Sequence, residues 1–385
     1  MKLGIPKESY PGERRVAMVP AHLSALAKQG ISVLLESGAG VAAGYPDAAY
    51  AEKGATVLPS RAEVFAQADA IAMVRAGGSN PAAEADNRLL RKDQVLVAFV
   101  DPLAKPHDAQ KLAETGASVY SMELIPRTTK AQSMDALSSM ANLAGYKAVL
   151  MAADAAPRIL PMMTTAAGTL TPAKVLVLGV GVAGLQAIAT AKRLGASVEA
   201  YDVRPEVREQ VQSVGGKFVD LGLDTSGMSG QGGYAKEQSA DFILKQQEAL
   251  AQFVRAADIV ITTAQIPGRK APVLVTAAMQ KGMKPGSIIV DLAAETGCNC
   301  ELSKAGETAV VDGVTMIAPV NLPSTMAFHA SQLYAKNVVN LLVYMTTKEG
   351  VFSPKDDDDI VRETRVARDG AVVHSRVLGA LAPKA

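Results

Sequence analysis

An apolar run that ends in three closely spaced glycines constrains the fold of this chain more than any other feature. Val175-Leu-Val-Leu-Gly179 is followed by Gly181 and Gly184, which completes the pattern G-x-G-x-x-G, and then by an Ala-rich segment. In this pattern the first glycine permits a tight turn, the second lets the backbone approach a pyrophosphate, and the third lets a helix pack closely on the strand. The amino terminus of that helix offers N–H groups and a partial positive charge to phosphate. The segment therefore predicts a strand, turn and helix that bind a dinucleotide.

Two other interpretations fit the glycine pattern alone. An ordinary Gly-rich turn between a strand and a helix would look the same, and residues 175–191 carry no charge and approach the length that spans a bilayer. The next strand, residues 197–202, favours the dinucleotide because it ends in Asp202. A carboxylate there can accept hydrogen bonds from both hydroxyls of the adenosine ribose.

Asp202 also predicts which dinucleotide binds. Its charge would repel the 2′-phosphate of NADP by on the order of 1–4 kcal/mol. Arg204, two residues further on, offers that phosphate a partner instead. We take Asp202 as the stronger determinant, so the expected cofactor is NAD(H).

Short apolar runs alternate with helical stretches along the whole chain, as in parallel α/β domains. We expect a first series of strands at 3–6, 32–35, 70–74, 95–100 and 118–122, and a second at 175–179, 197–202, 217–219, 258–263, 287–292 and 315–318. A long helix over 135–153 joins the two series, and another over 327–345 leaves the second. The expected fold is α/β, with two doubly wound parallel-sheet (Rossmann-like) domains and a cleft between them. The expected domains are 1–137 completed by 326–385, and the NAD(H)-binding domain 138–325.

Three shorter segments carry local predictions. Residues 161–172 lie between two prolines and predict an exposed hairpin arm, whose unpaired edges invite pairing with a second chain. The acidic run 356–359 is typical of a solvated turn. Residues 361–373 form a short segment in which apolar and polar side chains alternate.

Composition excludes several classes of protein. Lys plus Arg number 39 and Asp plus Glu 38, aromatic residues make up 4%, and Trp is absent, which argues against nucleic acid as a partner. The charges within the first eight residues argue against a signal peptide, so a cytosolic location is expected. Neither the two cysteines nor the four histidines have the spacing of metal ligands, so no metal is expected; these residues are Cys298, Cys300, His22, His107, His329 and His374.

The segment between the two series carries a polar stripe. Asp135, Ser138 and Asn142 share one side of a helix at i, i+3 and i+7 spacing. Such a stripe facing a glycine turn across a domain cleft is a candidate nicotinamide pocket, and a solvated helix face is the alternative.

Across nearly its full length the chain resembles the soluble NAD(H)-binding component, the alpha subunit, of proton-translocating nicotinamide nucleotide transhydrogenase. The Arg127, Gln132, Asp135 combination carries the resemblance most specifically. Further resembling segments are Gly4-Ile-Pro-Lys-Glu, Glu13-Arg-Arg-Val-Ala, Val180-Gly-Val-Ala-Gly-Leu-Gln-Ala-Ile-Ala, Gly232-Gly-Tyr-Ala-Lys-Glu, Ile266-Pro-Gly-Arg-Lys-Ala-Pro and Met283-Lys-Pro-Gly-Ser-Ile-Ile-Val-Asp-Leu-Ala.

The resemblance implies direct hydride transfer between NADH and NADP⁺, coupled to proton movement across a membrane by partner components. It implies a homodimer, an NADP(H)-binding partner, a membrane-embedded proton-channel partner, and a location on the cytoplasmic side of the inner membrane. The nicotinamide end of NAD(H) is implied to contact Arg127, Gln132, Asp135 and Ser138. The rest is implied to contact Gly179, Gly181, Val182, Gly184, Asp202, Val203, Arg204, Gly233, Tyr234 and Gln265. The family often has an aliphatic residue where this chain has Gln265. Residues 226–233 are expected to form a loop that closes over the nucleotide.

Two other functions remain open. The same segments resemble alanine dehydrogenase, which needs an arginine for the substrate carboxylate and a lysine and a histidine that handle protons. Arg15 matches, but Arg75 stands in the position of the lysine, the segment around Asp101 holds no histidine, and Glu295 replaces an aspartate. Arginine cannot exchange a proton near neutral pH, which disfavours amino-acid oxidation. The third possibility is an NAD-binding module without turnover, which mixing with an NADP-binding partner would distinguish.

Overall fold

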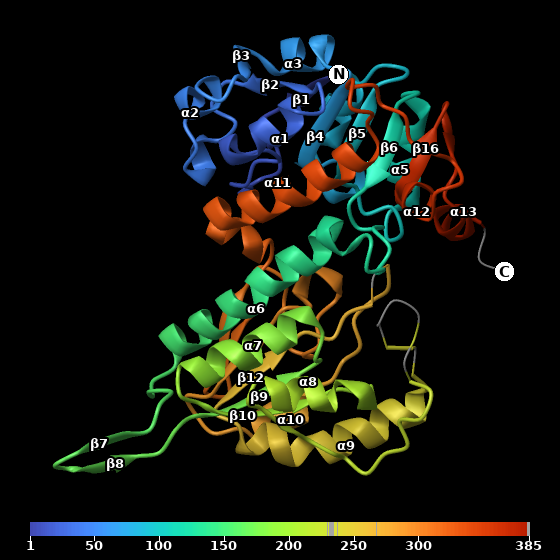
Figure 1. Cartoon of the computed structure of the whole chain (residues 1–385). Helices are drawn as coiled ribbons and strands as arrows, with labels where there is room; N and C mark the ends of the chain where they lie inside the picture. The colour runs from blue at the N-terminus through green and yellow to red at the C-terminus, as the bar shows by residue number, and fades with distance from the viewer. Residues whose placement is uncertain (229, 231–234, 237, 267, 383–385) are drawn as a thin grey trace. The chain divides into compact units, whose positions relative to one another are not determined.

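The computed structural model describes residues 1–228, 230, 235–236, 238–266 and 268–382. The chain separates into two compact units. Unit 1 comprises Met1–Met140 and Pro323–Ala385, and unit 2 comprises Ala141–Leu322. Each unit is built on its own largely parallel sheet with helices around it, so the predicted α/β class is confirmed (Figure 1).

The described residues of unit 1 form an eight-stranded sheet in the order β17-β16-β6-β5-β4-β1-β2-β3. The first six strands in sequence are parallel and follow the doubly wound order, and the last two add an antiparallel edge. Their bounds are β1 Lys2–Ile5, β2 Ser32–Glu36, β3 Thr56–Leu58, β4 Ala70–Arg75, β5 Val95–Phe99, β6 Ser118–Ser121, β16 Arg365–Arg368 and β17 Ala371–Val372.

The central strands of unit 1 are apolar on both faces because helices cover both sides of a parallel sheet. All five residues of β5 are buried, as are the first five of β4. The helices of unit 1 are α1 Leu23–Ala27, α2 Asp47–Ala51, α3 Arg61–Gln67, α4 Ala83–Asn87, α5 Pro106–Glu114, α11 Ala327–Tyr344, α12 Asp359–Thr364 and α13 Ser375–Leu381. Local capping fixes some of their starts: the Ser60 hydroxyl accepts the Glu63 N–H at the start of α3.

Unit 2 contains the predicted Rossmann sheet, in the order β11-β10-β9-β12-β13-β15-β14. Its first six parallel strands follow the order 3-2-1-4-5-6, so the topology reverses between β9 and β12, where such folds bind ligands. The bounds are β9 Lys174–Leu178, β10 Ser197–Tyr201, β11 Lys217–Phe218, β12 Ile259–Thr262, β13 Ile288–Asp291, β14 Thr308–Val311 and β15 Val314–Ile317.

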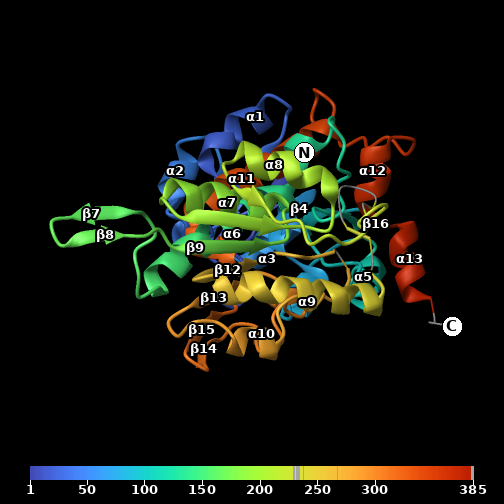
Figure 2. The same cartoon turned by 90° about the horizontal axis from the view of Figure 1, so that it is seen from below.

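Helices cover both faces of this second sheet, and α7 and α9 lie on opposite sides of it (Figure 2). Alternate residues of β9 point to the two layers: Val175 and Val177 join the core under α7, and Leu176 and Leu178 join the core under α9. The helices of unit 2 are α7 Val182–Arg193, α8 Arg208–Ser213, α9 Ala240–Ala256 and α10 Ala277–Lys281. The long helix α6, Ala136–Ala155, begins in unit 1 and continues into unit 2.

The predicted hairpin arm is present. Strands β7, Met163–Thr165, and β8, Gly168–Leu170, pair antiparallel as a two-stranded sheet of their own, and every residue in them is exposed. The hairpin extends away from the rest of unit 2 (Figures 1 and 2).

Segment 356–373 differs from its prediction only in part, and two edge strands were missed. The alternating segment 361–373 starts as α12, because Asp358 caps it by accepting the N–H groups of Ile360 and Val361, and it continues as β16 and β17. The acidic run forms the predicted exposed turn at residues 356–357, where Asp356 also pairs with two arginines of β16. Strands β3 and β14 escaped prediction because they are short and none of their residues is fully buried.

Candidate functional site

The glycine turn that was predicted to bind a dinucleotide follows the carboxyl end of β9 and leads into α7. Gly179 has a φ of +93°, in the left-handed region that favours glycine. Its N–H donates to the Tyr201 carbonyl at 2.9 Å, and its own carbonyl accepts the Thr263 hydroxyl at 2.8 Å. The turn is thereby fixed to the ends of both neighbouring strands, at the point where the topology reverses.

The other two glycines of the turn differ in what surrounds them. A Cβ on Gly184 would lie 2.0 Å from the Gly179 carbonyl oxygen, so the close approach of α7 to the turn requires glycine there. A Cβ on Gly181 would meet no protein atom within 4 Å. Packing within the chain therefore explains why glycine is needed at position 184, but it does not explain the glycine at position 181. The open space at Gly181, beside the N–H groups at the start of α7, suits a pyrophosphate.

Asp202 lies directly after β10, as predicted, and the residue is only 8% exposed. One oxygen of its carboxylate accepts the Val180 N–H of the turn at 2.7 Å, which ties the acid to the glycine motif. Arg204 donates to the same carboxylate through Nε at 2.8 Å and Nη2 at 2.7 Å. Val203, between them, is buried in the core under α9, so its side chain is part of the packing.

The loop after β12 holds Gln265, which is exposed and donates to the Leu292 carbonyl at 2.6 Å. Asn299 fixes this loop, because its side chain accepts the Ala264 N–H and donates to the Ala264 carbonyl, both at 2.9 Å. Sequence reasoning missed Asn299 and also Thr263, which bonds the glycine turn. The pair Thr262-Thr263 at the end of a strand was a signal in the sequence that could have identified Thr263. No spacing between residues in the sequence pointed to Asn299.

Two of the predicted cofactor contacts, Gly233 and Tyr234, lie outside the described residues, as does half of the loop expected to close over the nucleotide. Val182 is the first residue of α7 and is partly buried. The structure therefore brings together Gly179, Gly181, Val182, Gly184, Asp202, Val203 and Arg204 around the glycine turn.

The four residues predicted for the nicotinamide end belong to unit 1, three on the segment before α6 and Ser138 in its first turn. Gln132 is exposed and starts the short 3-10 helix η4, Gln132–Met134. Asp135 stands immediately before α6, where its carboxylate accepts the Ser138 N–H at 2.9 Å and the Ser138 hydroxyl at 2.6 Å. Arg127 lies 3.9 Å from the same carboxylate. Asp135 is thus the cap of α6 as well as a member of a small polar group with Arg127 and Ser138.

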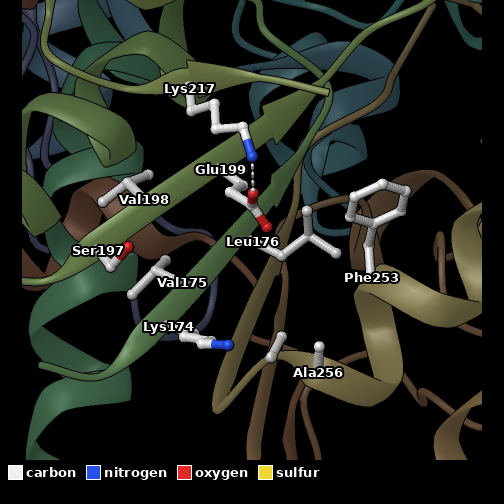
Figure 3. A pocket seen from close by; sticks show the side chains of 10 residues that line it. Lys174, Val175, Leu176, Ser197, Val198, Glu199, Lys217, Phe253 and Ala256 are labelled. Atoms are coloured by element: carbon white, nitrogen blue, oxygen red, sulfur yellow. Dashed lines mark hydrogen bonds and ion pairs between the residues drawn. The ribbon is translucent and has the colours of Figure 1, made fainter. Parts of the chain in front are cut away.

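A pocket of about 290 Å³ lies elsewhere in unit 2 (Figure 3). It is lined by residues at the amino-terminal ends of β9 and β10, the opposite edge of the sheet from the glycine turn, and by Phe253 of α9. Lys217 and Glu199 form an ion pair at 2.9 Å within it. None of the predicted site residues lines this pocket, and we do not assign the nucleotide to it.

Comparison with known proteins matches two family models to the chain. Residues 4–144 match the family model "Alanine dehydrogenase/PNT, N-terminal domain", and residues 148–375 match "Alanine dehydrogenase/PNT, C-terminal domain". The chain belongs to the alanine dehydrogenase/PNT family.

Within the alanine dehydrogenase/PNT family, similarity is higher to transhydrogenase subunits. The chain is 46% identical to an NAD(P) transhydrogenase alpha subunit of Rhodospirillum rubrum over 98% of this chain and 99% of that one. A solved transhydrogenase from Sinorhizobium meliloti is 42% identical and superposes with a TM-score of 0.83, covering 97% of this chain and 99% of that one. An alanine dehydrogenase of Halomonas elongata is 30% identical over 98% of this chain and 96% of that one. The family resemblance expected from the sequence is confirmed.

The positions that would carry alanine dehydrogenase chemistry lie mainly at the carboxyl edge of the unit 1 sheet. Arg15 is 3% exposed, and its guanidinium forms two hydrogen bonds of 2.7 Å with Glu13. Arg75 lies 3.4 Å from the same carboxylate and stacks over the ring of Tyr10. The buried arginine is therefore charge-paired within the chain. Glu8 accepts the N–H groups of Val74 and Arg75, and burial raises its pKa to about 8.

Membrane-spanning helices and metal centres are both absent from the residues that the structure describes. None of the helices there combines the length and apolar content needed to cross a bilayer. No three His, Cys, Asp or Glu side chains among the same residues are grouped as a metal site would require.

Proposed function

We propose that this chain is the NAD(H)-binding component of a proton-translocating transhydrogenase. The reaction moves a hydride from C4 of the dihydronicotinamide of NADH to C4 of the nicotinamide of NADP⁺ held on a partner component. The observation that carries the proposal is the open space at Gly181, in a turn anchored at the switch point of a Rossmann sheet and tied to Asp202.

Within unit 2, the chain's own residues bind and orient the nucleotide. The start of α7 provides N–H groups for the pyrophosphate, and Asp202 accepts the hydroxyls of the adenosine ribose. Val203, Arg204 and Gln265 lie on the loops around this end. Gly233 and Tyr234 complete the proposed contacts from the segment before α9.

Arg127, Gln132, Asp135 and Ser138 are proposed to bind the nicotinamide end. Hydride transfer requires the two nicotinamide rings to be in contact, so side chains here act by alignment rather than by proton transfer. The neutral amide of Gln132 is exposed and can bond groups on both the donor and the acceptor side.

Amino-acid oxidation is the second candidate function. The identity to an alanine dehydrogenase and the presence of Arg15 favour it. The proton-handling step does not fit, because Arg75 replaces the lysine and cannot exchange a proton near neutral pH. A third candidate, an NAD-binding module without turnover, leaves the Arg127–Asp135–Ser138 group without a role beyond capping α6.

We further propose that the chain works as a homodimer with an NADP(H)-binding component and a membrane-embedded proton-channel component. The exposed β7–β8 hairpin, with its unpaired edges, supports pairing with a second copy. Such partners would hold the chain on the cytoplasmic side of the inner membrane. Nucleic acid is not a proposed partner.

The proposed function is tested by measuring hydride transfer from NADH to an NADP⁺ analogue after mixing with an isolated NADP(H)-binding component. Transfer that requires both proteins supports it. Tight NADH binding without transfer would support the non-catalytic module, and NADH formation from NAD⁺ and alanine by this chain alone would support the dehydrogenase.

A further inference from the structure

The short helix η4, which carries Gln132, is held by two asparagines of α11. The carbonyl oxygen of Ser133, the residue after Gln132, accepts the side-chain amide of Asn337 at 3.0 Å and that of Asn340 at 2.9 Å. The two asparagines are three residues apart, so they project from the same face of α11. Two amide donors satisfy both lone pairs of one carbonyl, which fixes the direction of that peptide group.

The helix that supplies these donors is itself firmly anchored in unit 1. The Tyr334 hydroxyl donates to the Met73 carbonyl at 2.8 Å, and the Ser331 hydroxyl accepts the Val16 N–H at 3.0 Å. Both contacts are buried and tie α11 to β4 and to the loop after β1. The position of the Ser133 carbonyl is therefore set by the core of unit 1 rather than by the loop alone.

A second contact holds the other side of the same segment. Lys130 lies 3.3 Å from Asp358 and over the ring of Tyr344, whose hydroxyl donates to the same Asp358 carboxylate. Asp358 is also the cap of α12. Lys130 is 63% exposed, so this ion pair is the weaker of the two restraints.

We propose that Asn337 and Asn340 are positioning residues for Gln132. The proposal rests on the proposed function, because it takes Gln132 as the side chain that aligns the nicotinamide rings. Gln132 itself stays exposed while the peptide group between Ser133 and Met134 is fixed, which restrains the backbone that carries the Gln132 side chain. Alignment errors affect the hydride step far more than ground-state binding. Loss of the asparagine amides should therefore slow transfer and leave NADH affinity nearly unchanged.

The test uses the full chain with Asn340→Ala as the main variant, because Asn340 is only half-buried on α11 and its loss should leave the fold intact. Asn337→Ala, at a buried position, is the second variant. Gln332→Ala, exposed on the same helix, is the matched control. Three quantities are measured: the NADH dissociation constant, the single-turnover rate of transfer with the NADP(H)-binding component, and the rate of trypsin cleavage after Lys130 at a temperature well below unfolding.

For Asn340→Ala we expect transfer to slow by roughly fivefold and NADH affinity to change by less than about twofold, as lost alignment requires. Cleavage after Lys130 should accelerate, because the segment opens locally more often. The control should match the wild type in all three. In a Gln132→Asn background, adding Asn340→Ala should slow transfer further by a factor of less than about two. The added effect is small because both changes act through the side chain at position 132.

Normal transfer in both asparagine variants, with Gln132→Asn slow, overturns the positioning role and leaves the proposed function standing. Additive losses in the double variant also overturn it, because Asn340 would then act independently of Gln132. If Gln132→Asn transfers normally, the proposed nicotinamide site itself fails, and the positioning role fails with it.

Discussion

The carboxylate of Asp202 and the guanidinium of Arg204 form a two-pronged ion pair, with contacts of 2.8 and 2.7 Å. The backbone N–H groups of Arg204 and Val180 also donate to this carboxylate, at 2.9 and 2.7 Å. The sequence leaves open whether Arg204 binds a 2′-phosphate. The guanidinium could give its Nε and Nη2 donors to that phosphate only by leaving Asp202, and the hydrogen bond to Asp202 raises the pKa of Arg204.

This pair leads to a prediction on nucleotide choice. We expect the wild type to bind NADH more tightly than NADPH, and Asp202→Asn to reduce that preference by at least about fivefold, or ~1 kcal/mol of removed repulsion. Asp220→Asn breaks an exposed pair with Arg208 nearby and serves as the control. Fluorescence titration with both nucleotides measures the ratio. Equal or tighter NADPH binding by the wild type would make Arg204 the main determinant.

Gly181 and Gly184 have different surroundings, so substitutions at these two positions should affect different properties: NADH binding at Gly181 and folding stability at Gly184. Gly181→Ala should fold normally, because its Cβ meets nothing, but should weaken NADH binding by roughly tenfold or more as the methyl group enters the pyrophosphate space. Gly184→Ala should lose about 1–3 kcal/mol of unfolding free energy, since its Cβ would overlap the Gly179 carbonyl. Thermal unfolding and NADH titration check both. Unchanged NADH affinity in Gly181→Ala would remove the pyrophosphate from this turn.

Gln132 allows a test of the hydride step. Gln132→Asn should leave NADH affinity within a few-fold and slow transfer by roughly tenfold, which is about 1.4 kcal/mol of lost transition-state alignment. Stopped-flow single turnover with the NADP(H)-binding component measures it. A loss that weaker NADH binding explains in full would contradict this role.

Glu8, which is half-buried, should make stability depend on pH. Burial raises its pKa from the ordinary 4.5 to about 8, so between these values the folded state holds a proton that the unfolded chain has released. The contribution of Glu8 to stability is therefore greatest below pH 4.5 and falls as the pH rises to 8.

Relative to the wild type, Glu8→Gln should gain at least about 1.4 kcal/mol of unfolding free energy between about pH 5 and pH 8.5, the equivalent of a pKa difference of about 1. Urea unfolding at several pH values measures this difference. Glu84→Gln, at an exposed position, should show no such trend. A Glu8→Gln difference that stays constant with pH would contradict the raised pKa.

The hairpin predicts the state of assembly. We expect a mass near twice 40.0 kDa by light scattering. Replacing Met163 and Leu170, which are 45% and 52% exposed on β7 and β8, with lysine should shift the protein to monomer. Val310→Lys, at an exposed apolar position on β14, is the control. A wild type that stays monomeric at all concentrations would remove the hairpin as an assembly element.

Much of the fold could be predicted because buried parallel strands are apolar runs in the sequence itself, as in β4, β5, β9 and β12. The glycine turn could be predicted for the same local reason. What escaped prediction depends on contacts between distant residues. Asn340 reaches Ser133 across 207 positions, and Asn299 reaches Ala264 across 35, and neither separation leaves a pattern in spacing. The spacing of Asp135, Ser138 and Asn142 indicates a polar helix face. In the structure, however, the Asp135 carboxylate accepts the Ser138 N–H and so caps the start of α6.

The discontinuity of unit 1 has a consequence for synthesis. Its sheet receives β16 and β17 from the end of the chain, and α11 packs on it from residue 327 onward. Unit 2 is one continuous segment and can complete its sheet while residues 323–385 are still to be translated or lie in the ribosome. Unit 1, whose translation begins first, therefore completes its fold last. Until β16 is added, the edge of β6 remains open to chaperones and to other nascent chains.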